Sequence, residues 1–530
     1  MNNIKILDCT LRDGGYINNW SFGKDNIVSV CENLANAKIE IIEAGFLTDM
    51  PHTANESLFA NSEELKDVVK VKGNSKIAVM IAIGEKESDP SKLEDSSISG
   101  IDIVRITFHN TEKEIQKAVD YAKILKSKGY LVCMQPVGTT TYSDKELLNL
   151  IDVINDLKPY AFYLVDTLGT LYKNKLLHFV DLIDNNLAEG ICIGFHSHNN
   201  LQMSFSNSQL IIEYPSNREF IIDSSLYGMG RGAGNLCTEL VTRFLNERKN
   251  GEYNLVPILE AIDNFIYPIS LKLPWGYNAH YYMSAIHNCH PNYSSYLMNM
   301  QTLTMKDVNL LLQNLPKEER HLFNKKLIEE IYLNFQNSAN NSNVVSENVF
   351  EQGKEVLVLA PGYSLVSEKD KIKNLIGEKQ PIVVSINTKP ECYDVDYVFI
   401  SNRKRLYAFN YDNLNSKIII TSNLPKLTED FICVDYEALC DQEFEQPDNA
   451  GMMLLRLLNS NKVKKVYLAG FDGFSSPNKE NYYSNKIANI NTKEIAEKKN
   501  KDIVKQLAKI SKEINVEFVT KSYYQGKINE

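Results

Sequence analysis

The sequence predicts an α/β protein with two parallel-sheet domains, the first of them a (β/α)8 barrel. Over residues 1–245, eight short apolar runs of strand character alternate with amphipathic, helix-like segments. This number of repeats in this length favours a closed barrel over an open, doubly wound sheet. A segment rich in Asn and Ser follows at 336–353, and a second series of strand-like runs begins at residue 355.

The barrel strands are expected at 4–7, 39–44, 77–83, 101–107, 130–134, 161–165, 190–195 and 220–222. Between them, segments such as 112–127 and 144–157 place apolar residues at helical spacing. Closure of the barrel would set the first and eighth strands side by side. The carboxyl ends of barrel strands are where such folds place their chemistry.

The remainder of the chain divides by composition. We expect a barrel at 1–249, a small helical extension that caps it at 250–335, a linker at 336–353, and a Rossmann-like three-layer α/β domain at 354–530. Apolar residues at helical spacing in 308–312 and 323–335 predict the helical extension. Strands of the last domain are expected at 355–359, 382–386, 397–400, 417–421, 466–469 and 516–519.

Composition excludes several classes of protein. The net charge of −10 argues against a nucleic-acid partner or an anionic membrane surface. The N-terminal stretch carries charge throughout and lacks an apolar signal core, and no run reaches membrane-spanning length. The nine cysteines form no CxxC pair, which suits reduced thiols. We therefore expect a soluble cytoplasmic protein, and a homo-oligomer.

Three motifs at strand ends predict a metal site. The first strand runs into LDCTLRDGGY, which holds Asp13, and the seventh ends in FHSHNN, where His196 and His198 point to one face. The eighth leads into GMGRGAGN, which ends in Asn235. In a closed barrel these strands are neighbours, so the four side chains can converge on one divalent ion. Oxygen and nitrogen donors without thiolate favour Mn²⁺, Mg²⁺, Fe²⁺ or Co²⁺ over Zn²⁺.

The motifs LDCTLRDGG, HSHNN and GMGRGAGN, in this order, resemble those of the DRE-TIM metallolyase (HMG-CoA lyase-like) superfamily, which includes 4-hydroxy-2-oxovalerate aldolase. The resemblance covers about residues 1–300. It implies a divalent ion on Asp13, His196 and His198, joined by Asn235 in some members. It also implies that Arg12 stabilises an enolate. In the aldolase branch a hydroxyl residue after the sixth strand's aspartate contacts the substrate carboxylate, and Thr167 stands at that position.

The chemistry explains why these groups occur together. Making or breaking a carbon–carbon bond next to a ketone passes through an enolate, and a divalent cation polarises the keto oxygen. Arg12, which is always protonated, adds a fixed positive charge. We expect a carbon–carbon lyase, an aldolase that uses the enolate of a 2-oxo acid, pyruvate, with an aldehyde, which could be a sugar, as its partner.

The general base is the point of departure from the aldolases. They carry a histidine three residues after the metal aspartate, and this chain has Tyr16, a poor base at an ordinary pKa. Either Tyr16 donates a hydrogen bond while a bound water or another residue takes the proton, or the base comes from elsewhere. Tyr277, in a stretch that resembles the aldolases' helical domain, ranks beside Tyr16, ahead of His280 and His109.

Two polar residues at strand ends, Glu43 and Arg105, are expected either to bind substrate or to order the groups around them. Two other branches fit less well. The acyl-CoA condensing enzymes usually follow the aspartate with Gly-Glu-Gln, which is absent here, and the lyases carry a reactive cysteine that segment 228–234 lacks. A Claisen-type condensation remains one alternative. A catalytically silent barrel that serves as a scaffold is the other.

In the C-terminal domain, LAPGYSL and VYLAGFDGF each follow a predicted strand. The pair faintly resembles sialyltransferase-like domains of surface-glycan biosynthesis, which implies a nucleotide-sugar site and a role in surface-polysaccharide biosynthesis. The candidate ligand residues are Gly362, Ser364, Asn387 and Asp472. Since APGYSL has one glycine, it is no dinucleotide fingerprint. A non-catalytic docking domain is the alternative.

Overall fold

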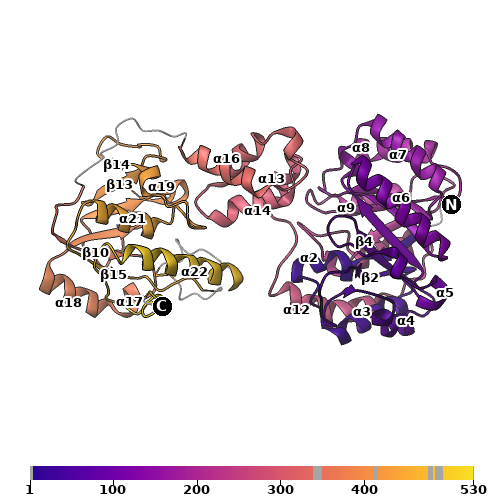
Figure 1. The fold of residues 1–530 in the computed structure, drawn as a ribbon, viewed down its shortest axis with the longest axis horizontal. Coiled ribbons are helices and arrows are strands. Elements are labelled where there is room, and N and C mark those ends of the chain that lie inside the picture. The colour runs from indigo at the N-terminus through magenta and orange to yellow at the C-terminus, as the bar shows by residue number, and fades with distance from the viewer. Residues whose placement is uncertain (1–3, 338–348, 411–414, 476–481, 484–492, 529–530) are drawn as a thin grey trace. The chain divides into compact units, whose positions relative to one another are not determined.

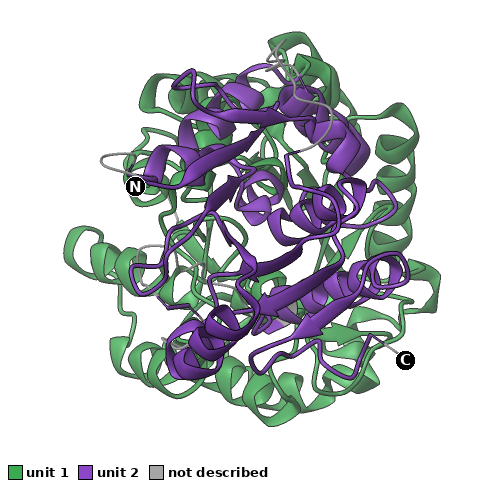
Figure 2. Cartoon of the chain, turned by 90° about the vertical axis from the view of Figure 1, so that its left-hand side faces the viewer, with its two compact units in different colours: residues 1–294, 316–323 green, residues 295–315, 324–530 purple. Residues whose placement is uncertain are grey.

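The computed structural model describes residues 4–337, 349–410, 415–475, 482–483 and 493–528, and all structural statements below concern these ranges (Figure 1). The chain forms two compact units. Unit 1 comprises residues 1–294 and 316–323, and unit 2 comprises 295–315 and 324–530 (Figure 2). The expected helical extension is therefore shared between the units. Most of the expected linker, 338–348, lies outside the described residues.

Unit 1 contains the predicted (β/α)8 barrel. Its eight parallel strands are β1 (Ile4–Asp8), β2 (Ile41–Leu47), β4 (Lys76–Ala82), β5 (Ile103–Phe108), β6 (Leu131–Pro136), β7 (Ala161–Asp166), β8 (Cys192–Ser197) and β9 (Phe220–Ser224). Each strand pairs with the next, and β1 pairs with both β2 and β9, which closes the barrel. The short β3 (Leu58–Phe59) adds to β2 outside this ring.

The longer helices of unit 1 surround the strands (Figure 1). They are α3 (Lys24–Asn36), α4 (Lys66–Val71), α6 (Glu112–Ser127), α7 (Asp144–Leu157), α8 (Lys173–Asn186), α9 (Ser204–Ile212) and α10 (Thr238–Arg248). α7 shows why they form. Ser143 and Glu146 make a capping box at its start, and five apolar residues at helical spacing are buried.

Shorter helices complete unit 1: α1 (Thr10–Asp13), α2 (Gly15–Asn18), α5 (Ser96–Ser99), α11 (Leu255–Ala261), α12 (Tyr267–Ser270) and α13 (Ala279–Ile286). α14 (Pro291–Met300) begins in unit 1 and ends in unit 2. No described helix is long and apolar enough to cross a membrane.

Alternation along the strands separates two apolar layers. Ile6, Ile42 and Phe162 belong to the layer between strands and helices, whereas their neighbours Leu7 and Ile41 belong to a second cluster. Because successive strand residues point to opposite faces, this second cluster fills the barrel interior. Polar residues whose side chains also face the barrel interior are therefore buried beneath the mouth of the barrel.

Unit 2 is built on a seven-stranded parallel sheet in the order β14-β13-β12-β11-β10-β15-β16. The strands are β10 (Glu355–Leu359), β11 (Ile382–Ile386), β12 (Tyr397–Ile400), β13 (Lys417–Thr421), β14 (Ile432–Val434), β15 (Lys465–Ala469) and β16 (Val516–Phe518). Its helices are α15 (Met305–Gln313), α16 (Lys325–Asn337), α17 (Ser364–Ser367), α18 (Lys369–Lys379), α19 (Arg403–Ala408), α20 (Tyr436–Leu439), α21 (Ala450–Ser460) and α22 (Lys493–Ile510).

Two separate apolar clusters cover the two faces of this sheet. One joins α21 and α22 to the strands through residues such as Met453 and Leu507, and the other includes Leu365, Ile372 and Leu406 from α17, α18 and α19. Helices on both faces of a parallel sheet make a three-layer α/β domain, as predicted. From β10 to β14, each new strand adds to the same edge of the sheet. The chain then returns, and β15 pairs with the other edge of β10.

We predict that Phe162→Ala destabilises the barrel by about 3–5 kcal/mol, because it leaves a cavity in the layer between strands and helices. Phe162 is 0% exposed. Urea unfolding followed by circular dichroism measures the change in the free energy of unfolding. Leu271→Ala is the control, since Leu271 is 69% exposed and its truncation should change stability by less than about 0.5 kcal/mol. Equal effects of the two substitutions would contradict this packing.

Candidate active site

The polar residues predicted to form a site come from the carboxyl ends of neighbouring barrel strands. β1 runs directly into α1, which carries Arg12 and Asp13. His196 lies on β8, and His198 follows its last residue. Asn235 lies in the glycine-rich segment after β9, and its backbone forms an isolated antiparallel bridge with His198. Closure of the barrel brings these segments together although they lie far apart in the sequence.

Three of the predicted metal ligands form one buried cluster. One ligand atom each of Asp13, His196 and His198 lies within 4.8 Å of the others. His196 Nε2 is 4.0 Å from Asp13 Oδ1, and the two imidazole rings lie 5.2 Å apart at 88°. Asn235 Nδ2 donates to Asp13 Oδ2 at 2.7 Å, so the fourth predicted residue adjoins the same carboxylate.

The chemistry of this cluster fits a divalent cation. Among the described residues, His198 Nδ1 and Asn235 Oδ1 are buried with no hydrogen-bond partner, an arrangement that costs free energy unless a ligand satisfies it. Burial lowers the pKa of His198 to about 3, so its ring is neutral. Burial alone would raise the pKa of Asp13, but the Arg12 guanidinium and the two histidines hold it well below its usual range. The carboxylate is therefore charged.

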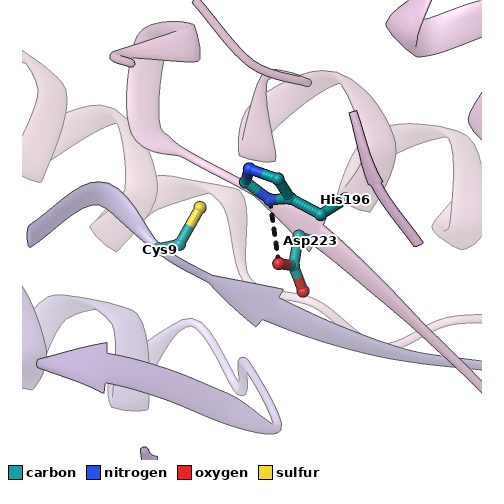
Figure 3. Close-up of side chains that lie close together, drawn as sticks. All are labelled: Cys9, His196 and Asp223. Atoms are coloured by element: carbon teal, nitrogen blue, oxygen red, sulfur yellow. Dashed lines mark hydrogen bonds and ion pairs between the residues drawn. The ribbon is translucent and has the colours of Figure 1, made fainter. Parts of the chain in front are cut away.

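Behind the cluster, Asp223 orients His196 (Figure 3). His196 Nδ1 lies 2.9 Å from Asp223 Oδ2, which leaves Nε2 on the side of Asp13. Cys9 lies beside this pair, but burial raises the pKa of its thiol, and its Sγ donates to the Ser224 carbonyl at 3.2 Å. We interpret the group of Cys9, His196 and Asp223 as support for the ligand His196, in the way that carboxylates fix metal-binding imidazoles.

A buried network of alternating charge links Arg12 to this support. Arg12 Nε donates to Glu43 Oε2 at 2.8 Å, and Nη1 donates to Asp13 Oδ1 at 2.5 Å. Arg105 Nη1 lies 2.8 Å from the same Glu43 oxygen, and its Nη2 pairs with Asp223. Arg12 Nη2 is buried and has no hydrogen-bond partner in the part of the chain that the structure describes. The network thus holds Arg12 rigidly and leaves one donor for a ligand.

Glu43 and Arg105 were expected to bind substrate or to order their surroundings. Their side chains are fully buried, and Arg105 also stacks on the Tyr163 ring, 4.6 Å from its centroid. Thr167 follows β7 and accepts from the Gly138 backbone N–H at 2.8 Å. This burial favours the ordering role for Glu43 and Arg105. Contact between Thr167 and substrate stays a prediction.

Tyr16 lies in an environment that sequence reasoning missed. Its hydroxyl is 3.2 Å from Glu85 Oε1, and Arg231 and Lys86 stand 5.4 and 5.3 Å from its ring centroid. Burial and the Glu85 charge raise the pKa of Tyr16. The phenol therefore keeps its proton at neutral pH, which suits a hydrogen-bond donor and not a base. The polar run Glu85-Lys86-Glu87 shortly after β4 was the signal available in the sequence.

The other candidates for the base differ in their surroundings. Tyr277 is 62% exposed ahead of α13, and the His109 ring is engaged by Glu114 at 3.0 Å. His280 Nδ1 is buried without a hydrogen-bond partner. His290, not singled out from the sequence as a catalytic residue, is half-buried, and burial together with the charges of Arg231 and His198 lowers its pKa to about 3.

Known proteins resemble the barrel half of this chain. Residues 3–264 match the HMGL-like family model. Over 276 residues the chain is 27% identical to 4-hydroxy-2-oxovalerate aldolase from Geobacillus genomosp. 3, which spans 50% of this chain and 77% of that protein. Over 247 residues it is 27% identical to oxaloacetate decarboxylase from Mycobacterium tuberculosis, which spans 46% and 70% respectively.

Among solved structures, the N-terminal domain of a Bacteroides vulgatus protein described as an aldolase aligns with a TM-score of 0.48 at 25% identity. This alignment covers 57% of this chain and 98% of that domain. The family match, the aldolase and decarboxylase relatives and the three strand-end motifs coincide on the same half of the chain. The barrel of this protein belongs to the HMGL-like, or DRE-TIM metallolyase, superfamily.

Proposed function

We propose that the barrel is a divalent-metal-dependent aldolase that acts through the enolate of pyruvate. The observation that carries this proposal is the convergence of Asp13, His196, His198 and Asn235 beside Arg12, whose Nη2 is buried without a partner. Two relatives support the substrate class, since 4-hydroxy-2-oxovalerate and oxaloacetate are both 2-oxo acids. Cleavage of the first and decarboxylation of the second both release the pyruvate enolate.

Asp13, His196, His198 and Asn235 would hold the metal ion, for which Mn²⁺ or Mg²⁺ is our first choice. When bound, such an ion polarises the keto oxygen of a 2-oxo acid as a Lewis acid. Arg12 supplies the second positive charge. Burial would lower its pKa, but Glu43 and Asp13 raise it, so the guanidinium stays charged. Its Nη2 donates to the enolate oxygen as negative charge develops there. Thr167 is our candidate for the substrate carboxylate.

Tyr16 acts in this scheme on the aldehyde. Its phenol keeps its proton, which it donates to Glu85 Oε1 in this structure. When the aldehyde binds, this O–H turns from Glu85 to the carbonyl oxygen of the aldehyde, where negative charge appears as the new carbon–carbon bond forms. Arg231 holds the ring in place. Tyr277 stays a weaker candidate, since its side chain is 62% exposed.

Decarboxylation of oxaloacetate is the second candidate, because the relative with that name is as similar in sequence as the aldolase. It uses the same enolate but needs no aldehyde. Loss of oxaloacetate without turnover of any aldehyde would favour it. Exchange of acetyl-CoA methyl protons would instead support a condensing enzyme. The homo-oligomer and the place in surface-polysaccharide biosynthesis stay predictions.

The first test measures exchange of the pyruvate methyl protons in D₂O with added Mn²⁺ or Mg²⁺. The metal ion is removed after the exchange, and the remaining methyl protons are then measured by NMR. Exchange that needs metal and stops with chelator is expected, because enolate formation releases a methyl proton to solvent. The proposal is contradicted if the protein binds the metal ion but neither exchanges the methyl protons of pyruvate nor forms the enolate from oxaloacetate.

We predict that Asp13→Asn abolishes this exchange and weakens metal binding at least 100-fold, because it removes the charged ligand. Isothermal titration with Mn²⁺ measures the binding, and circular dichroism checks the fold. Asp25→Asn, at an exposed position on α3, is the matched control. Wild-type metal affinity in Asp13→Asn would overturn the metal assignment.

We predict that Arg12→Lys lowers the exchange rate about 100-fold while metal binding changes little, since lysine cannot both pair with Glu43 and present a second donor. The same NMR assay and Mn²⁺ titration separate the two effects. Arg243→Lys, on the exposed surface of α10, controls for the substitution itself. Unchanged exchange would remove Arg12 from the proposed chemistry.

We predict that Tyr16→Phe lowers the rate of aldol cleavage of 4-hydroxy-2-oxovalerate at least 10-fold but leaves pyruvate exchange within about threefold. The phenol contacts the aldehyde oxygen, which exchange does not involve. Tyr172→Phe is the control, at a site 59% exposed. Parallel loss of both activities would place Tyr16 at the enolate instead.

A further inference from the structure

Unit 2 contains a cavity of about 200 Å³ at the carboxyl edge of its sheet. Its walls come from the turns that follow β10 and β15, from the end of β11, and from the start of α21 and the side of α22. The strand order reverses between β10 and β15. In open α/β sheets, ligands bind in the crevice at this switch point. The position of the cavity therefore indicates a ligand site independent of the barrel.

The two turns at the switch point are packed backbone against backbone. A Cβ on Gly362 would lie 2.3 Å from the Gly470 carbonyl oxygen, and a Cβ on Gly470, whose φ is +77°, would lie 2.0 Å from the Ala360 carbonyl oxygen. The Gly362 N–H donates to the Gly470 oxygen at 3.0 Å. Only glycine fits at either position, so main chain forms this wall of the cavity.

Two cations stand in the cavity wall. Lys499 is 8% exposed, and burial lowers its pKa to about 8. Its Nζ donates to Gln301 Oε1 at 2.8 Å. Arg405, on α19, has its pKa lowered by burial as well. Both side chains bring positive charge to the cavity wall, which favours a bound anion.

The two carboxylates of the wall are engaged elsewhere. Asp448 accepts from the hydroxyls of Tyr332 and Tyr436, and Asp472 accepts from the backbone N–H and hydroxyl of Ser364. Burial raises the pKa of both carboxyl groups.

An unpartnered acceptor lies at the end of the neighbouring strand. Asn387 follows β11 with a left-handed φ of 60°, and its Oδ1 is buried with no hydrogen-bond partner among the described residues. Such an oxygen is satisfied by a hydrogen-bond donor, and a hydroxyl group of a ligand can supply one. Phe471, Phe474 and Tyr524 add apolar ring surface to the same cavity.

We propose that this cavity binds a small phosphorylated polyol, a nucleotide or a sugar phosphate, with its phosphate near Lys499 and Arg405 and a hydroxyl on Asn387. A phosphate suits the positive charge of this wall, and a hydroxyl suits the amide oxygen. The cavity volume of about 200 Å³ is below the range typical of drug-sized ligands, which favours a small ligand. Gly362, Asn387 and Asp472, which the sequence singled out, line this cavity, and Ser364 bonds Asp472 beside it.

The test is isothermal titration of the full chain, at fixed ionic strength, with uridine 5′-monophosphate, glucose 1-phosphate and inorganic phosphate. We expect saturable binding of one of the two organic phosphates. The compound that binds more tightly shows whether the ligand is a nucleotide or a sugar phosphate. Lys499→Met should weaken that binding at least 10-fold. Lys498→Met is the matched control on the same helix, since its side chain is 65% exposed, and it should bind within twofold of wild type.

Asn387→Gly, which keeps the left-handed backbone, should weaken the organic phosphate at least fivefold and leave inorganic phosphate unchanged. It also keeps the proposal testable if Lys499→Met fails to fold. Pyruvate exchange, which belongs to the barrel, should stay at the wild-type rate in both variants. Absence of binding at millimolar concentration, or equal affinity in Lys499→Met and Lys498→Met, would overturn the proposal.

Discussion

Closure of the barrel is the constraint on which the candidate metal site depends. β1 pairs in parallel with β9, so that Leu7 lies opposite Asp223, and on its other edge with β2. Asp13 and Asn235 are 222 positions apart in the chain, yet the amide donates directly to the carboxylate. An open sheet would leave β1 and β9 at opposite edges. The site therefore exists only because the eight strands form a ring.

Within the ring, burial of the network around Arg12 and Arg105 is tolerated because each charge in it has an oppositely charged neighbour. Arg105 pairs with Glu43 on one side and Asp223 on the other, and each acid in turn holds a group that faces the site. Removing one member would strand its partner in a medium where an unpaired charge is costly. The fixed geometry of Arg12 and His196 is thus a property of the whole network.

The sequence predicted the strands well, because apolar runs mark buried parallel strands. Most barrel strands nevertheless end later than expected: Asp8, Asp166 and Ser197 continue the pairing although they are polar. β14 was missed, since three residues carry no periodic signal. The grouping of α15 and α16 with unit 2 could not be predicted, because an apolar helix face does not identify the surface that covers it.

For the site, sequence reasoning found the residues of the strand-end motifs and missed the loop contacts of Tyr16. Strand alternation and closure fix where Asp13 and His196 must lie, so spacing alone brought them together. Glu85 and Arg231 meet Tyr16 from two different loops, whose paths follow from packing and not from a repeat. Burial is the main reason why the pKa of Tyr16 is raised; the Glu85 charge raises it further and the Arg231 charge lowers it. The surroundings of Tyr16, which stands where the aldolases have a histidine base, therefore come from loop residues.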